Sequence, residues 1–385
     1  MPISYPYQQY QGVWTLSQAS DAVAQSKWPV PPQPHLYAWG LNAIGQLGLN
    51  NRTNYSSPMQ IGSLTNWLNI SGGIYSVFSI KKDGTLWSWG NNNNGQLGLG
   101  SRTAYSSPKQ VGTLTNWLNV SCSRYSAIAT KTDGTLWSWG QNYHGQLGLG
   151  NTTYYSSPKQ VGTLTNWLSV STSYTSMFAI KTNGTLWSWG YNSAGECGLG
   201  NTNQYSSPKQ VGSLTTWLSV VGAYNSCYAI KTDGTLWSWG SGSLGCLGLG
   251  NTTYYSSPKQ VGLLTTWSSI AGGYQYVLAT KTDGTLWAWG YNAYGQLGLG
   301  NITNYSSPKQ IGSLTSWNKI SASGDSLASY ATQNNGTLWS WGFGINGALG
   351  LGNTTSYSSP KQVGSLTTWS SISAGKTCSY AIATT

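Results

Sequence analysis

Short runs of apolar residues alternate with turn-forming residues along nearly the whole chain, and the runs recur with a fixed period. The string Leu-Trp-Ser-Trp-Gly, or a close variant of it, begins at Leu36, Leu86, Leu136, Leu186, Leu236, Leu286 and Leu338. Successive starts are fifty residues apart, except for the last spacing of fifty-two. A period of about 40 to 50 residues built from short β-segments is typical of a β-propeller. We therefore predict seven repeats in one all-β body.

Each repeat has the pattern of four strands joined by turns. In the second repeat these strands are residues 86–90, 109–112, 117–121 and 127–132. Trp87 and Trp89 share one face of the first strand, because side chains alternate along a strand. Pro108 precedes the second strand and predicts that this strand is the outer edge of its blade, since proline cannot donate to a central ladder. Asp133-Gly134 predicts a type I′ hairpin turn that folds the next repeat back onto the preceding strand.

The two ends of the repeat region complete one another. The last repeat ends in residues 379–385 without a further Leu-Trp-Ser-Trp-Gly string, and the first begins with an unpartnered strand at residues 36–40. Pairing of the N-terminal strand with the C-terminal strand would close the ring and remove exposed edges. The predicted fold class is therefore all-β: a seven-bladed β-propeller over residues 36–385, closed by its terminal strands, with a short arm over residues 1–35.

The N-terminal arm differs in composition from the repeats. Its aromatic residues are Tyr5, Tyr7, Tyr10 and Trp14. Residues 15–27 predict a short helix, and the proline-rich residues 29–34 predict a stiff extended spacer. Residues 12–29 also resemble short N-terminal stretches of virion proteins from tailed bacteriophages. We interpret the arm as a tether whose four aromatic side chains attach the protein to a partner.

The repeat resembles that of a known family. The patterns WSWG-x-N-x-x-G-Q-L-G-L-G, S-P-K-Q-V and A-x-K-T-D-G are similar to the RCC1-like repeat over residues 36–385. This resemblance implies a seven-bladed propeller. The founding activity of that family is nucleotide exchange on a small nuclear GTPase, and other members bind proteins or inhibit enzymes. This chain has no long insertion to act as an exchange wedge, and the histidine common in family repeats is replaced, for instance by Tyr125. The resemblance therefore implies the fold and not one activity.

The composition argues against catalysis. Charged residues make up 6% of the chain, whereas 22 Trp and 26 Tyr supply ample apolar surface for a packed body. The two histidines, His35 and His144, and the seven acidic residues are too scattered for a histidine triad, a metal site or paired carboxylates. Asp83 occupies a turn position where other repeats have Asn183 or Asn335, so this position requires turn geometry and not a carboxylate. We predict no enzyme activity, no metal and no cofactor.

The net charge of +11 raises the question of nucleic-acid binding. Most lysines recur at two fixed places in each repeat, represented by Lys109 and Lys131, and only three arginines are present. Such lysines form two rings around the body, whereas phosphate binding usually requires a clustered patch. We therefore predict no nucleic-acid partner.

Cysteine usage and hydropathy set two further expectations. The five cysteines are odd in number and fall at unrelated repeat positions, which favours free thiols over a disulfide framework. No apolar run approaches the roughly 20 residues that cross a bilayer, so we predict no membrane insertion. The first residues also lack the pattern of a secretory signal.

Comparison of the seven repeats predicts two unequal faces. In a four-stranded meander, the loops after the first and third strands emerge on one face. These loops differ between repeats, as in Q-N-Y-H-G against Y-N-S-A-G, whereas T-L-T-N-W and K-T-D-G on the opposite face hardly change. The variable loops are rich in Tyr, Asn, Ser and Gly, as antibody paratopes are. Neutral drift of surface loops is the alternative. The candidate binding residues are Arg124, Tyr125, Tyr143, His144, Tyr154, Tyr155, Tyr174, Tyr191, Tyr224, Tyr274 and Tyr294.

Three functional hypotheses fit this organisation. The first is a non-enzymatic structural or display protein of a bacteriophage virion, on tail or capsid and assembled in the host cytoplasm. Its arm would bind other virion proteins, and its variable face would bind a host-surface protein or glycan. The second is a cellular, cytoplasmic RCC1-like regulator that binds another protein, such as a small GTPase. The third is a glycan-binding propeller that uses Tyr154 and Tyr155. A homo-oligomer is compatible with each hypothesis.

Overall fold

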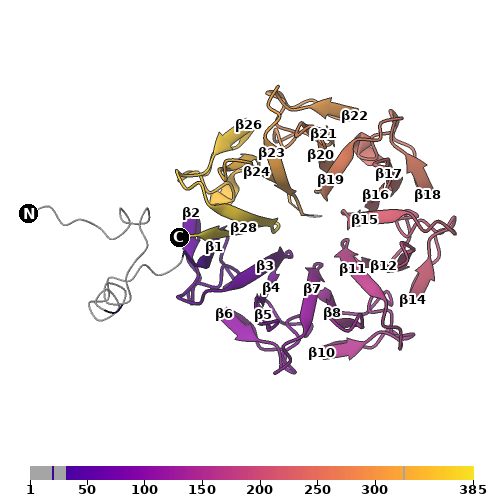
Figure 1. Cartoon of the computed structure of the whole chain (residues 1–385), viewed down its shortest axis with the longest axis horizontal. Helices are drawn as coiled ribbons and strands as arrows, with labels where there is room; N and C mark the ends of the chain where they lie inside the picture. The colour runs from indigo at the N-terminus through magenta and orange to yellow at the C-terminus, as the bar shows by residue number, and fades with distance from the viewer. Residues whose placement is uncertain (1–19, 21–31, 324–325) are drawn as a thin grey trace, which may run out of the picture.

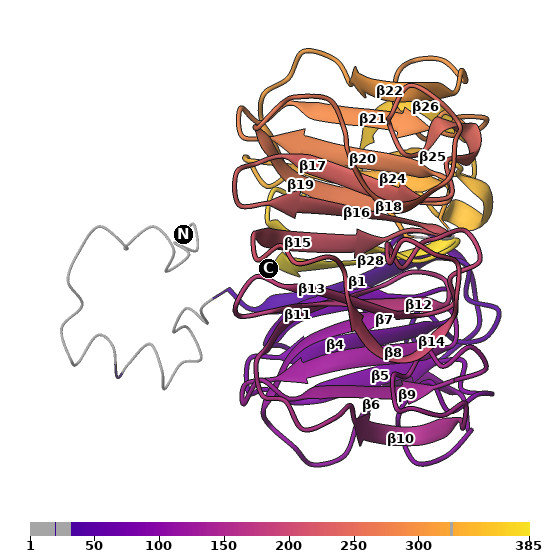
Figure 2. The same cartoon turned by 90° about the vertical axis from the view of Figure 1, so that its right-hand side faces the viewer.

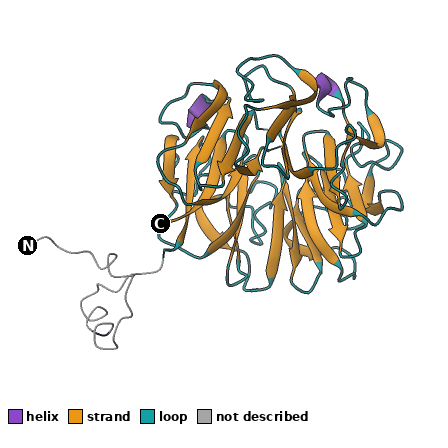
Figure 3. Cartoon of the chain, turned by 45° about the horizontal axis from the view of Figure 1, so that its top comes forward, coloured by secondary structure: helices purple, strands orange, loops and turns teal. Residues whose placement is uncertain are grey.

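The repeat region folds into a ring of seven four-stranded antiparallel sheets around a central axis (Figure 1). The computed structural model describes Ser20, residues 32–323 and residues 326–385. Strands and loops make up nearly all of the described chain, and the helical segments of the ring are two short turns (Figure 3). The predicted all-β, seven-bladed propeller is confirmed.

Six blades are built from consecutive strands, ordered from the axis to the periphery (Figure 1). The innermost strands are β3 (Trp67–Gly72), β7 (Trp117–Cys122), β11 (Trp167–Thr172), β15 (Trp217–Gly222), β19 (Trp267–Gly272) and β23 (Trp317–Ser321). The second strands are β4 (Ser76–Lys81), β8 (Ser126–Lys131), β12 (Ser176–Lys181), β16 (Ser226–Lys231), β20 (Tyr276–Lys281) and β24 (Ala328–Gln333). The third strands are β5 (Leu86–Gly90), β9 (Leu136–Gly140), β13 (Leu186–Gly190), β17 (Leu236–Gly240), β21 (Leu286–Gly290) and β25 (Leu338–Gly342). The outer strands are β6 (Tyr105–Gln110), β10 (Tyr155–Gln160), β14 (Tyr205–Gln210), β18 (Tyr255–Gln260), β22 (Tyr305–Gln310) and β26 (Tyr357–Gln362). The short helical turns are η2 (Ser243–Gly245) and η3 (Ile345–Gly347).

The seventh blade closes the ring with strands from both ends of the repeat region. Its order is β2 (Tyr55–Gln60), β1 (Pro34–Gly40), β28 (Cys378–Thr384) and β27 (Trp369–Ala374). Strands β1 and β28 pair antiparallel over their whole length, from Pro34 opposite Thr384 to Gly40 opposite Cys378. Closure by the terminal strands, as predicted, is confirmed. Strand β1 begins at Pro34, two residues before the start predicted from the repeat.

The outer strand differs from its prediction in extent. Strand β6 covers Tyr105–Gln110, whereas the sequence pattern predicted residues 109–112. Pro108 therefore lies within the strand. Strand β6 pairs only with β5 in its sheet, so the side of the strand that faces away from β5 needs no ladder donor. The predicted position of this strand at the blade edge is confirmed.

The predicted type I′ turn at Asp133-Gly134 is wrong, although the hairpin exists. Gly134 has φ +74, but Asp133 is not among the residues with positive φ, so the two central residues that a type I′ turn requires are absent. The Gly134 N–H donates to the Lys131 carbonyl at 2.9 Å, and Lys131 N–H donates to the Thr135 carbonyl at 3.1 Å. These bonds define a longer loop in which a turn over residues 131–134 ends on a left-handed glycine.

Asp133, the residue before Gly134, serves the turn as a hydrogen-bond acceptor. Asp133 Oδ1 accepts from Thr135 N at 2.9 Å and from Thr135 Oγ1 at 2.6 Å. Asn183 Oδ1 accepts from the equivalent atoms of Thr185 at 3.2 and 2.7 Å. The side-chain oxygen common to Asp and Asn is therefore what the turn uses, as their exchange predicted.

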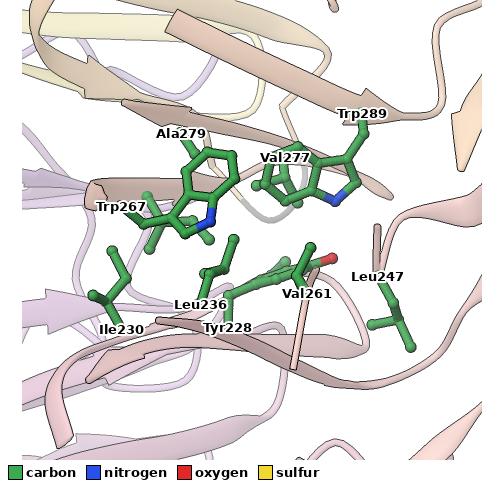
Figure 4. Packing of buried hydrophobic residues seen from close by; sticks show 11 residues of the cluster. Tyr228, Ile230, Leu236, Leu247, Val261, Trp267, Val277, Ala279 and Trp289 are labelled. Atoms are coloured by element: carbon green, nitrogen blue, oxygen red, sulfur yellow. The ribbon is translucent and has the colours of Figure 1, made fainter. Parts of the chain in front are cut away.

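The apolar core lies between blades and not only within them. One cluster combines Tyr228 and Leu236 of one blade with Trp267, Val277 and Trp289 of the next (Figure 4). Each of these side chains is at most 3% exposed. The repeated tryptophans therefore form the packing between blades, where large aromatic residues bury the most area.

A hydrogen bond repeated around the ring joins each blade to the repeat before it. Trp139 Nε1 donates to the Gln96 carbonyl at 2.9 Å, and in the closing blade Trp39 Nε1 donates to the Ala348 carbonyl at 2.8 Å. Gly98 lies against the same indole, where a Cβ would stand 2.8 Å from Trp139 Nε1. The Gly-Gln-Leu-Gly string, or its variant with the same two glycines, thus packs against the tryptophan of the next blade in every repeat.

The five cysteines are free and buried. Burial raises the pKa of the Cys122 thiol to about 12, so this group stays protonated and unreactive at neutral pH. Among the residues that the structure describes, no helix is long and apolar enough to span a bilayer.

Candidate binding face

The strand directions place the two kinds of variable loop on the same face of the ring. In the blade of β7 to β10, antiparallel pairing of β7 with β8 and of β8 with β9 brings loops 123–125 and 141–154 to the same end. We call this end of every blade the variable face and the opposite end the uniform face. The helical turn η3 belongs to a long loop of the variable face. Viewed edge-on, the ring has the C-terminus on the left and η3, in yellow, on the right (Figure 2). The chain therefore ends on the uniform face.

On the variable face, loops from six neighbouring blades carry a continuous run of aromatic rings, which we call the aromatic arc. Successive ring centroids lie 4.7 to 6.5 Å apart, except at one step that an arginine bridges. The members are Tyr75, Arg124, Tyr125, Tyr174, Tyr224, Tyr274, Tyr291, Tyr294 and Phe343. Because each comes from a loop of a rigid sheet, neighbouring blades hold the rings in fixed relation.

Arg124 is the cation of the aromatic arc. Its guanidinium carbon lies 4.8 Å from the ring centroid of Tyr125 and 5.1 Å from that of Tyr174. The buried Arg124 Nε has no hydrogen-bond partner among the described residues. An arginine stacked between two rings presents a planar, weakly hydrated cation, as is common at protein interfaces.

The structure brings most of the predicted binding residues into the arc or beside it. Six of the eleven are arc members: Arg124, Tyr125, Tyr174, Tyr224, Tyr274 and Tyr294. A second group lies on the neighbouring long loops, where the His144 ring contacts Tyr143 edge-to-face, with centroids 4.8 Å apart, and Tyr191 in a tilted arrangement at 4.6 Å. His144 Nδ1 also lies 3.1 Å from Gln204 Oε1.

Two predicted residues take other places. The hydroxyl of Tyr154 accepts a hydrogen bond from Gln141 Nε2 at 3.3 Å within one long loop. Tyr155 opens the outer strand β10, and Lys159 Nζ lies 5.5 Å from its ring centroid. Tyrosine stands at the equivalent position of every repeat, so Tyr155 is part of the common scaffold.

Three arc members were absent from the prediction. Tyr75 is the repeat equivalent of Tyr125, and Tyr291 and Phe343 are equivalents of Tyr191. Alignment of the repeats position by position would have found these three residues, because each occupies the same repeat position as a predicted binding residue. The attachment residues Tyr5, Tyr7, Tyr10 and Trp14, and the helix predicted over residues 15–27 apart from Ser20, lie outside the described residues.

The centre of the variable face is shallow. A cavity of about 30 Å³ opens there, lined in part by Ile74, Arg124 and Tyr174. Pockets for small ligands usually hold roughly 300 to 1,000 Å³. Within residues 32–323 and 326–385, no group of three or more His, Cys, Asp or Glu could hold a metal ion. The arc is therefore suited to contact by a surface and not to enclosure of a small molecule.

The lysines at one of the two repeated positions stack on tryptophan side chains. Lys131 Nζ lies 3.7 Å from the ring centroid of Trp137 and 4.8 Å from that of Trp117. Burial lowers the pKa of Lys131 despite the nearby Asp133 carboxylate. Since the equivalent lysines 181, 231 and 281 stack in the same way, this ring of lysines has little freedom to neutralise phosphates.

Leu244 carries backbone strain on the variable face. It lies in η2 with φ 58 and ψ 17, in the left-handed region that disfavours a leucine, and its side chain is 38% exposed. The equivalent residue in the last repeat is Asn346, with φ 59 and ψ 16. Asparagine tolerates this conformation.

Leu244→Asn is therefore expected to raise the free energy of unfolding by about 1 kcal/mol, because it removes the strain and sacrifices little buried surface. Urea denaturation of the full chain measures the change. Leu264→Asn is a control at an exposed leucine without positive φ and should not stabilise. Equal effects of the two substitutions would show that strain is not the cause.

Comparison with known proteins gives one repeat family and one fold. A model described as the regulator of chromosome condensation (RCC1) repeat matches residues 35–80, 83–130, 133–180, 183–230, 233–280, 283–328 and 335–382. A second model with the same description matches residues 68–96, 117–146 and 267–296. A search of curated proteins found no match.

Solved structures share the architecture at low sequence identity. Prp20p from Saccharomyces cerevisiae, whose structure was described with its binding properties to Gsp1p and histones, is 20% identical, with a TM-score of 0.82 and 92% of each chain covered. Yeast RCC1 (Prp20) bound to Kap60 is 19% identical, with a TM-score of 0.82 and coverage of 92% of this chain and 89% of that one. Human WBSCR16 is 21% identical, with a TM-score of 0.81 and coverage of 91% and 99%.

Proposed function

The chain belongs to the regulator of chromosome condensation (RCC1) repeat family, and from this premise we propose that it is a non-enzymatic binding protein that recognises another protein through the aromatic arc. The arc is the observation that carries this proposal. Partner-binding surfaces concentrate Tyr, Trp and Arg at their centre and place polar residues around them. Tyr174, Tyr224 and Arg124 lie at the centre of the variable face, and the long loops around them are rich in Asn, Ser and Thr.

The solved relatives support a protein partner. Prp20p was studied for its binding to Gsp1p and histones, and its complex with Kap60 is a protein complex. For this chain the same class of partner is proposed, without a particular protein, because the sequence identities are only 19 to 21%. The hypothesis of a cellular protein-binding regulator is therefore favoured over that of a bacteriophage virion protein, for which no comparison offers support.

The shape of the face favours a protein over a sugar or a small molecule. The central cavity of about 30 Å³ is too small for a monosaccharide or a nucleotide. Adjacent rings such as Tyr174 and Tyr224 are tilted by 59° to each other, so they do not offer one flat platform for a sugar ring. Tilted tyrosine rings interdigitate more readily with the side chains of a second protein.

Removal of two arc rings is expected to abolish partner binding. Tyr174→Ser with Tyr224→Ser should weaken the complex about a thousand-fold, since two hot-spot residues commonly contribute about 2 kcal/mol each. Affinity capture with the tagged full chain, followed by titration of the captured protein, measures the loss. The thermal midpoint should change little, because both rings are only half-buried.

Leu214→Ser with Leu264→Ser is the matched control, since these leucines are 45% and 48% exposed on the uniform face. This control should keep full affinity. Retained binding by the tyrosine variant, together with loss in the leucine control, would place the partner on the uniform face and refute the proposal.

A further inference from the structure

The uniform face carries a groove at the boundary between neighbouring blades. Between the blade that ends in β22 and the blade that starts at β23, the groove encloses about 410 Å³. Trp317, Trp339 and Pro360 line it from one blade, and Gln310 and Leu314 line it from the other. Residues 298–300, at the end of the Gly-rich part of the long loop before β22, complete the lining. The two preceding boundaries have equivalent grooves of about 400 and 340 Å³. Each groove is large enough for an aromatic side chain and is lined mainly by apolar groups.

The leucine at the mouth of each groove repeats around the ring. Its exposed fraction lies between 37% and 50% in all seven copies, namely Leu64, Leu114, Leu164, Leu214, Leu264, Leu314 and Leu366. Further exposed leucines lie close by in sequence, among them Leu263 at 90%. A single exposed leucine needs no explanation, but a ring of them beside apolar grooves indicates a surface that something covers.

The N-terminal arm enters the ring beside this surface. Gln33 N donates to the carbonyl of Thr385 at 3.1 Å, so the arm joins β1 at the uniform face, where the C-terminus also lies (Figure 2). His35 Nδ1 lies 3.1 Å from Gln60 Nε2. Gln60 is the repeat equivalent of Gln310, which lines a groove. The arm therefore leaves the ring next to a groove position.

The arm is long enough to reach every groove. From Gln33 back to Trp14 is 19 residues, which can span up to roughly 65 Å at about 3.4 Å per residue. A compact body of about 350 residues has a radius of gyration of roughly 20 Å. A tethered segment of this length also has an effective concentration in the millimolar range, so weak contacts suffice for docking.

We propose that the aromatic segment of the chain's own arm, residues 5–14, docks into the inter-blade grooves of the uniform face. Tyr5, Tyr7, Tyr10 and Trp14 are the side chains that would enter the grooves. Residues 5–14 contain no charged residue, so no charge is desolvated on docking. This inference does not depend on the proposed function, because it concerns the face opposite the aromatic arc.

Photo-crosslinking in the full chain tests the docking. A benzophenone amino acid in place of Tyr10 is expected to crosslink to residues that line the grooves, such as Leu314 and Pro360 or their repeat equivalents. A mixture of ¹⁴N- and ¹⁵N-labelled protein separates crosslinks within one chain from those between chains. Crosslinks within one chain to groove residues support the proposal. Crosslinks between chains, crosslinks to the variable face, or none above background overturn it.

Hydrogen exchange provides an independent measurement. In the full chain with Tyr5, Tyr7, Tyr10 and Trp14 all changed to Ser, amides of the connections that bear the groove leucines, such as residues 311–316, should exchange at least three-fold faster. Residues 123–125 and 173–175, in the inner loops of the variable face, are the internal control and should not change, because neither segment nor its repeat equivalents line a groove. Unchanged exchange at 311–316 and its equivalents overturns the proposal, whatever the partner-binding experiment shows.

Discussion

Glu196→Gln is expected to raise the free energy of unfolding by about 2 kcal/mol at pH 8 and to lower it by about 1 kcal/mol at pH 4. Glu196 is 1% exposed, and its Oε2 accepts a hydrogen bond from Ala194 N at 2.8 Å. Gln46, Gln96, Gln146 and Gln296 occupy this position in four other repeats. The scaffold therefore accommodates a neutral amide here, and the carboxyl of Glu196 is an exception.

The pH dependence follows from the raised pKa of this carboxyl. Burial raises the pKa of Glu196 from 4.5 to about 7, although backbone hydrogen bonds act in the opposite direction. Between these values, the unfolded chain releases its proton and the folded chain retains it, so stability falls as the pH rises. Above pH 7 the loss is complete, at about 3 kcal/mol. The neighbouring titratable groups Cys197 and Cys227 stay protonated in this range, because burial raises the pKa of both thiols.

The amide of the Glu196→Gln variant recovers most, but not all, of the stability that ionisation of Glu196 costs above pH 7. Gln296 Nε2, in the equivalent place, is buried without a hydrogen-bond partner among the described residues. An unpaired amide costs about 1 kcal/mol, so the net gain is about 2 kcal/mol. Urea denaturation at pH 4 and pH 8 measures it. Gln146→Glu is the reciprocal control and should lose stability at pH 8 only. A gain for Glu196→Gln that is equal at both pH values would rule out ionisation as the cause.

Gly134→Ala is expected to destabilise the protein by about 3 kcal/mol, whereas Gly112→Ala should cost only about 1 kcal/mol. Both glycines have positive φ, +74 and +63 respectively. A Cβ on Gly134 would stand 2.0 Å from the Thr165 carbonyl oxygen, but a Cβ on Gly112 would have nothing within 4 Å. Both substitutions therefore carry the cost of placing alanine at positive φ, and only Gly134→Ala adds a steric collision.

The collision involves the contact between two blades. The Gly134 carbonyl accepts a hydrogen bond from Trp167 N at 3.1 Å, where the next blade begins. A Cβ at Gly134 would push the hairpin turn away from that connection. Urea denaturation of the two variants measures the difference. Equal losses would show that the turn tolerates displacement and that only its backbone conformation is required.

The repeat pattern was sufficient to predict the ring and its closure. Trp87 and Trp89 on alternate positions, with a spacing of fifty residues to the next copy, specify one strand in each blade. The unpartnered strands at the two ends could satisfy their edges only by pairing, and Tyr37 indeed lies opposite Ala381. The turn type was predicted wrongly because the dipeptide Asp-Gly fits two loop lengths, and the Thr135 side chain selects the longer one.

The sequence by itself determined the number of blades, the closure of the ring and the segregation of variable loops to one face. All three follow from the repeat period and from the alternating direction of the four strands in each repeat. Only the tertiary structure decided which loops meet. Tyr174, Tyr224 and Tyr274 are fifty residues apart in the chain, and their rings lie 4.8 to 5.0 Å apart because adjacent blades converge toward the axis. The structure likewise decided that Lys131 stacks on tryptophan and that the arm joins the uniform face. These contacts depend on distances across blades, which a one-dimensional pattern does not contain.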